Sequence, residues 1–149
     1  LRRKGRRVAV VYGDCGTGGE IDAFLKAEKV DRIPGPHCYE MFMGPSEFGA
    51  EMERELGTLF LTDYMVLHFE RIVMQGMGLR KHPQLRDMYF GNYTRALYIA
   101  QTEDEGLQAK ARAAAAELGL AYEYRFTGFG GLPAWVAASV SAGMPAKGD

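Results

Sequence analysis

Short β-branched runs alternate with stretches of helical periodicity along this chain. Strand-like apolar runs lie at residues 8–12, 30–33, 58–63, 96–100 and 121–126. Between them lie segments with apolar residues at helical spacing. Strands that alternate with helices in this way require right-handed crossovers and a mostly parallel sheet. We therefore predict an α/β fold: one open sheet of about five strands with helices on both faces, a Rossmann-like three-layer sandwich.

Two helix starts have the spacing of a capping box. Thr17 precedes Glu20 by three residues, and Thr102 precedes Glu105 by three residues. In a capping box the threonine and the acidic side chain satisfy free backbone donors of the first turn. We therefore expect each of these helices to begin at its threonine.

Nothing in the sequence divides the chain internally. Its 149 residues, 47% of them hydrophobic, suffice for one substantial core, and they contain no solenoid repeat or low-complexity linker. We predict a single α/β domain over residues 1–149, with residues 139–149 as a flexible tail. Because the first residue is Leu1, we expect this domain to be the C-terminal part of a longer protein.

The charge balance argues against two classes of partner. Lys and Arg number 18 against 19 Asp and Glu, which gives no reason to expect nucleic acid or an acidic membrane surface. No apolar stretch has the length of a membrane span, and the basic start lacks the apolar core of a signal peptide. We expect a cytoplasmic protein whose two cysteines are free thiols or metal ligands.

Polar side chains that can take part in chemistry gather where the predicted strands end. In open α/β sheets the ligand crevice lies beyond the carboxyl ends of the strands. The residues at these ends are Asp14, Cys15, Thr17, His37, Cys38, Thr62, Asp63, Tyr64, Gln101, Thr102 and Thr127. Both cysteines and one of the three histidines belong to this set, although core packing does not require them there.

Cys15, His37 and Cys38 form the predicted metal site. Cys15 precedes a predicted helix, where the helix dipole and free amides lower the pKa of a thiol. Two thiolates and one imidazole match the three protein ligands of a catalytic zinc, with one position left for water or substrate. Because neighbours on an extended chain point in opposite directions, His37 and Cys38 converge only on a turn. Alternatively, Cys15 is a small residue in a tight turn and Cys38 a buried hydrophobe.

The glycine-rich stretch GDCGTGG, residues 13–19, allows a second hypothesis. Its free amides ahead of a helix can hold an anion, although the spacing matches neither the dinucleotide fingerprint nor a Walker motif. Asp14 would repel such an anion. The predicted ligand-binding residues are Asp14, Gly16, Thr17, Gly18, Gly19, Thr62, Asp63 and Tyr64. In this alternative the protein is a non-catalytic binding module for a small anionic metabolite.

Five stretches together resemble an uncharacterised family. They are YGDCGTGG, RIPGPHCYE, GTLFLTDYMVLHFER, HPQLRDMYFGNY and LAYEYRFTGFGGL. In combination, from Val8 to Leu132, they are similar to the bacterial and archaeal domain-of-unknown-function family 1638 (DUF1638). The resemblance implies a cytoplasmic α/β protein of unproven activity. Because members often occur near genes for corrinoid-dependent methyl transfer, it also implies a corrinoid or methyltransferase protein as partner.

Two departures from the family pattern concern the predicted metal site. Family members usually carry an additional N-terminal α/β segment with its own cysteine and histidine, which we expect this chain to lack. Many relatives place an acidic residue between the histidine and the cysteine, whereas His37 and Cys38 are adjacent. We predict a zinc- or thiolate-dependent domain linked to one-carbon methyl transfer, and we keep self-association into a homo-oligomer open.

Overall fold

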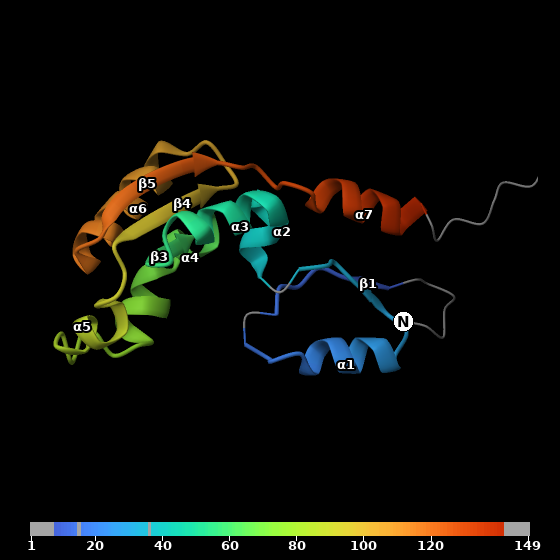
Figure 1. The fold of residues 1–149 in the computed structure, drawn as a ribbon, viewed down its shortest axis with the longest axis horizontal. Helices are drawn as coiled ribbons and strands as arrows, with labels where there is room; N and C mark the ends of the chain where they lie inside the picture. The colour runs from blue at the N-terminus through green and yellow to red at the C-terminus, as the bar shows by residue number, and fades with distance from the viewer. Residues whose placement is uncertain (1–7, 15, 36, 142–149) are drawn as a thin grey trace, which may run out of the picture. The chain divides into compact units, whose positions relative to one another are not determined.

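The computed structural model describes residues 8–14, 16–35 and 37–141 (Figure 1). Its elements are β1 (Ala9–Val10), α1 (Glu20–Ala27), β2 (Asp31–Arg32), α2 (Cys38–Met43), α3 (Pro45–Arg54), β3 (Thr58–Leu61), α4 (Asp63–Leu67), the π-helical turn η2 (Glu70–Gln75), α5 (Leu85–Phe90), β4 (Arg95–Ala100), α6 (Glu105–Leu118), β5 (Ala121–Phe126) and α7 (Leu132–Ser141). They form two compact units: one spans residues 48–128, and the other combines the parts of the chain before and after it. None of the helices in the described part of the chain has the length and apolar character needed to span a bilayer.

The unit of residues 48–128 is built on a parallel sheet with the strand order β3-β4-β5 (Figure 1). All six residues of the central strand β4 are buried. In the register of the sheet, Tyr98 lies between Leu61 and Tyr124, so these side chains share one face. The core on that face is formed with α4, η2 and α6, and the small residues Ala111 and Ala115 of α6 are completely or almost completely buried in it.

The opposite face of the same sheet contains a buried ion pair. Arg95, at the start of β4, donates from Nη2 to Oε2 of Glu51 in α3 at 2.6 Å. The same guanidinium donates to Glu123 at 2.7 Å and to the hydroxyl of Thr58 at 2.8 Å. Burial alone would raise the pKa of Glu51, but hydrogen bonds from Arg95 and Arg125 outweigh it and lower the pKa. The charges of this face are therefore mutually compensated.

The other unit starts with a β-α-β arrangement in which β1 and β2 pair in parallel and α1 forms the crossover. Val10 lies opposite Arg32 in this pairing. The Arg32 guanidinium donates to both carboxylate oxygens of Asp22 in α1, at 2.6 and 3.0 Å. Its Nη1 also donates to the carbonyls of Tyr12 and Gly35, which follow β1 and β2. Arg32 therefore holds together the chain segments that leave the two strands.

The same unit includes α2, whose end contacts the turn that precedes α7. A Cβ atom on Gly130, which has a φ of +52°, would lie 2.4 Å from the carbonyl oxygen of Phe42. The rings of Phe42 and Phe129 meet edge to face, with centroids 6.4 Å apart. Only glycine allows this contact, because a side chain would collide with the end of α2. The helix α7 includes positions 139–141 of the predicted tail, and the remainder of that tail lies outside the described residues.

The predicted α/β class, with parallel strands flanked by helices, is confirmed. The strands, however, belong to two sheets in the described residues, β1-β2 and β3-β4-β5, where we predict one sheet of about five. The first two strands pair with each other over only two residues each. Local periodicity predicts each strand but not the partner with which it pairs.

Both predicted capping boxes are wrong. The residue before α1 is Gly19 and the residue before α6 is Asp104, so each helix begins after the predicted threonine. The physical reason is the same in both cases, because each threonine hydroxyl donates to an aspartate at the end of a strand. The pairs are Thr17 with Asp14 at 2.5 Å and Thr102 with Asp63 at 2.7 Å.

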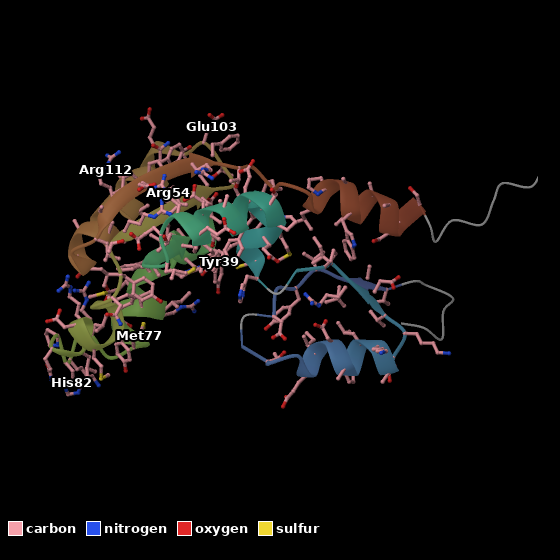
Figure 2. The ribbon with its side chains drawn as sticks, in the orientation of Figure 1. Tyr39, Arg54, Met77, His82, Glu103 and Arg112 are labelled. Atoms are coloured by element: carbon pink, nitrogen blue, oxygen red, sulfur yellow. The ribbon has the colours of Figure 1, made fainter. Side chains whose placement is uncertain are left out.

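The buried ion pair gives a stability prediction. Replacing Arg95 by leucine leaves the buried Glu51 carboxylate without its buried cation, so we expect Arg95→Leu to lower the free energy of unfolding by about 3 kcal/mol. Arg54, labelled in Figure 2, also contacts Glu51 but has a half-exposed side chain. Arg54→Leu should therefore cost less than about 1 kcal/mol. Urea unfolding followed by circular dichroism compares the two, and equal losses would contradict the role given to burial.

Candidate functional site

The loop after β1 is organised around the carboxylate of Asp14. One oxygen accepts hydrogen bonds from the backbone amide of Thr17 at 2.7 Å and from its hydroxyl at 2.5 Å. The other oxygen accepts from the amide of Gly19 at 2.7 Å. The hydroxyl and amide of Thr17, with the Gly19 amide, lower the pKa of Asp14 from 3.8 to about 2. The carboxylate is therefore ionised at neutral pH and fixes the course of the loop.

This arrangement bears on the predicted anion site at the same loop. The amides of Thr17 and Gly19 already donate to a negative group of the chain itself. Gly18 and Gly19 adopt the left-handed φ values of +60° and +92°, which glycine accepts without strain. An external anion on these amides would compete with Asp14. The ligand-binding role of Gly16 to Gly19 stays a prediction.

The start of α2 lies directly against the beginning of the glycine-rich loop. An ideal Cβ atom on Gly13 would lie 2.5 Å from the amide nitrogen of Cys38. It would also lie 3.1 Å from both the Cys38 Cα and the His37 carbonyl carbon. No side chain fits at this position without moving the backbone. The glycine at position 13 therefore allows the loop and the His37–Cys38 peptide to touch.

His37 and Cys38 lie at the start of α2. His37 is extended, with φ −126° and ψ 148°, and Cys38 is the first residue of α2. Cys38 is half-buried, whereas the alternative hypothesis expects a buried hydrophobe at this position. The His37 ring lies 6.4 Å from the ring of Tyr39, which is labelled in Figure 2.

The third predicted ligand, Cys15, lies outside the described residues. Within residues 8–14, 16–35 and 37–141, no three His, Cys, Asp or Glu side chains are grouped so that they could hold a metal ion. That search does not include Cys15. The peptide between His37 and Cys38 lies against Gly13, two positions before Cys15 in the sequence.

At the end of β3, in the other unit, Asp63 forms a closed hydrogen-bond cluster. Its carboxylate accepts from the Tyr98 hydroxyl at 2.7 Å, the Gln101 amide at 3.0 Å, and the amide and hydroxyl of Thr102 at 3.0 and 2.7 Å. The Asp63 amide donates to the Gln101 side chain at 2.9 Å. Burial, followed by the bond to Asp63, raises the pKa of Tyr98. The four hydrogen bonds that the Asp63 carboxylate accepts connect the end of β3 to β4 and to the residues that follow β4.

Thr62 and Tyr64, the sequence neighbours of Asp63, differ in burial: Thr62 is buried and Tyr64 is exposed. The Thr62 hydroxyl accepts from the Met65 amide at 3.3 Å and caps α4. Tyr64 is exposed, and its ring meets His68 edge to face with centroids 4.6 Å apart. Thr62 and Asp63 thus serve local structure. Of the predicted ligand-binding residues at this strand end, Tyr64 presents the most exposed side chain.

Two residues important to these sites were not among the predicted site residues. Arg32 holds the two strand ends together, and its hydrogen bond to Asp22 is the main cause of its raised pKa. Tyr98 lies inside the apolar run 96–100, so it resembles an ordinary core residue. The signal for Tyr98 is chemical, because a buried tyrosine hydroxyl needs a hydrogen-bond partner.

Comparison with known proteins finds a family model described as a protein of unknown function (DUF1638), which matches residues 1–134. Neither a curated protein nor a solved structure matches this chain.

The Asp14 cluster gives a titration prediction. We expect the Asp14 carboxyl to titrate near pH 2 in an NMR experiment. Because the ionised form is the one stabilised, its contribution to stability is present above pH 3.8 and is lost as the pH falls through about 2. Thr17→Val removes the hydroxyl donor and should move the midpoint upward. Thr102→Val, which removes a hydroxyl from the Asp63 cluster, should leave it unchanged, and a shift in this control would contradict the assignment.

Proposed function

The chain belongs to the DUF1638 family of proteins of unknown function, and we propose that it is a metal-dependent domain that holds zinc through Cys15, His37 and Cys38. The main support is the contact between Gly13 and the His37–Cys38 peptide. Without that contact, residues more than twenty positions apart would have no reason to share an ion. The alternative within this proposal is a reactive thiolate at the same position.

Chain reach supports the inclusion of Cys15. Cys15 follows Gly13 by two residues, and two residues span at most about 7 Å. Zinc binds thiolate sulfur at about 2.3 Å, and each cysteine side chain adds reach of its own. A thiolate at position 15 is therefore within reach of an ion bound beside Cys38.

The hydrogen bonds around the proposed zinc site hold its backbone in one conformation. The carboxylate of Asp14 fixes the loop through Thr17 and Gly19, and Arg32 fixes the segments that follow β1 and β2. Rigid support of this kind holds metal ligands in position. A zinc ion with three protein ligands supplies an open position at which water or substrate is activated.

The non-catalytic alternative has less support. An anionic metabolite on the glycine-rich loop would need the amides of Thr17 and Gly19, which donate to Asp14. The link to one-carbon methyl transfer, with a corrinoid or methyltransferase partner, rests on the family resemblance and stays a prediction. The cytoplasmic location and the absence of nucleic-acid and membrane partners also stay predictions.

Metal content tests the donor set. Protein purified without chelator should contain about one equivalent of zinc by elemental analysis, because three N and S ligands form a zinc site. The double variant Cys15→Ser, Cys38→Ser should contain almost none. His82→Asn alters an exposed histidine elsewhere and should keep the metal of the unaltered protein. A chain without zinc, or a double variant that retains it, would refute the proposal.

A second prediction tests the contact itself without altering any ligand. Gly13→Ala places a Cβ atom 2.5 Å from the Cys38 amide, so the loop must move away from α2. We expect zinc affinity, measured by competition with a colorimetric chelator, to fall by about 10- to 100-fold. Gly16→Ala is the matched control, because its Cβ would meet nothing within 4 Å. Thermal unfolding of both variants separates loss of fold from loss of metal, and equal affinities in folded variants would count against the site.

A further inference from the structure

The strand β5 is an edge of its sheet in the described part of the chain, with β4 on one side (Figure 1). The amide of Ala121 donates to Thr94, and the amide of Thr127 donates to Ala100. In a parallel ladder, alternate residues of a strand bond to the same neighbour. The residues between them, Tyr122, Tyr124 and Phe126, therefore direct their backbone N–H and C=O groups away from β4.

The sequence of this edge lacks several residues that usually keep an edge strand from pairing. Residues 121–126 contain no lysine, proline or glycine. Tyr124 is 38% exposed and Phe126 is 49% exposed. A regular edge strand with open backbone groups and exposed aromatic rings is a template for another strand.

We propose that two copies of this chain pair antiparallel through β5, about a two-fold axis at Tyr124, and so join their three-stranded sheets. In this register Tyr124 faces the partner's Tyr124, and Tyr122 faces the partner's Phe126. All of these residues have backbone groups that point outward, so each facing pair exchanges two hydrogen bonds. The pairs also place aromatic side chains opposite one another on one face.

The charges on the other face favour a second copy over an unrelated strand. The same register sets Glu123 opposite the partner's Arg125. Both side chains are partly exposed, and each also has an ion pair within its own chain, Glu123 with Arg54 and Arg95, and Arg125 with Glu51. Opposite charges at facing positions stabilise an antiparallel pair, and like charges destabilise it. A register centred on Glu123 or on Arg125 would oppose like charges and would need backbone groups already bonded to β4. The strand is therefore complementary to itself in one register, as a two-fold interface requires.

The mass of the full chain in solution tests the pairing. Sedimentation equilibrium up to about 100 μM should show a reversible dimer. Tyr124→Lys places two ammonium groups opposite each other at the axis and should weaken dimerisation about tenfold or more. Tyr89→Lys is the matched control, because Tyr89 is 39% exposed and lies in α5. A monomeric unaltered chain, or a folded Tyr124→Lys variant that dimerises normally, would overturn the proposal.

Cross-linking tests the register. Facing residues of a hydrogen-bonded antiparallel pair have Cα atoms about 5.5 Å apart, within the range of a disulfide. In a Cys15→Ser, Cys38→Ser background, oxidation should therefore cross-link Tyr124→Cys. Phe126→Cys faces position 122 of the second copy and should not cross-link. A cross-link at position 126 and none at position 124 would refute the two-fold axis at Tyr124.

Discussion

The contact between Gly13 and the His37–Cys38 peptide is the constraint on which the candidate site depends. It follows from the parallel pairing of β1 and β2, because parallel strands bring the segments after their carboxyl ends to the same edge. Arg32 secures those segments through the carbonyls of Tyr12 and Gly35. A glycine is required because any Cβ atom would overlap the backbone of Cys38. The loop that begins at Gly13 and the helix α2, which begins at Cys38, are thus in direct contact although they are far apart in the sequence.

Two aspartates at strand ends perform the same structural task in the two units. Asp14 accepts from the hydroxyl and amide of Thr17, and Asp63 accepts from the hydroxyl and amide of Thr102. Each carboxylate thus uses its charge to order a loop that begins a helix. A carboxylate whose oxygens are occupied in this way has little capacity left for a ligand. The cysteine and histidine side chains at the strand ends are therefore better candidates for binding a ligand than Asp14 and Asp63.

Local patterns predicted local structure well, and long-range contacts less well. The predicted strand 96–100 is observed as Arg95–Ala100, and 121–126 is observed with the predicted bounds, because alternation and burial are properties of short segments. The predicted capping boxes are wrong because the hydroxyls of Thr17 and Thr102 donate to aspartates instead of capping the helices. The acceptor of Thr102 lies 39 residues away, which spacing alone does not indicate. The adjacency of Gly13 and Cys38 could be anticipated only through the rule for strand ends.

X-ray absorption at the zinc edge tests the central claim most directly, because it identifies the atoms bound to the metal in the protein as purified. The account predicts two sulfur neighbours at about 2.3 Å and one imidazole nitrogen at about 2.0–2.1 Å. Replacing Cys38 by serine should remove one of the two sulfur neighbours. A spectrum with only nitrogen and oxygen neighbours would contradict the assignment of Cys15, His37 and Cys38 as a metal site.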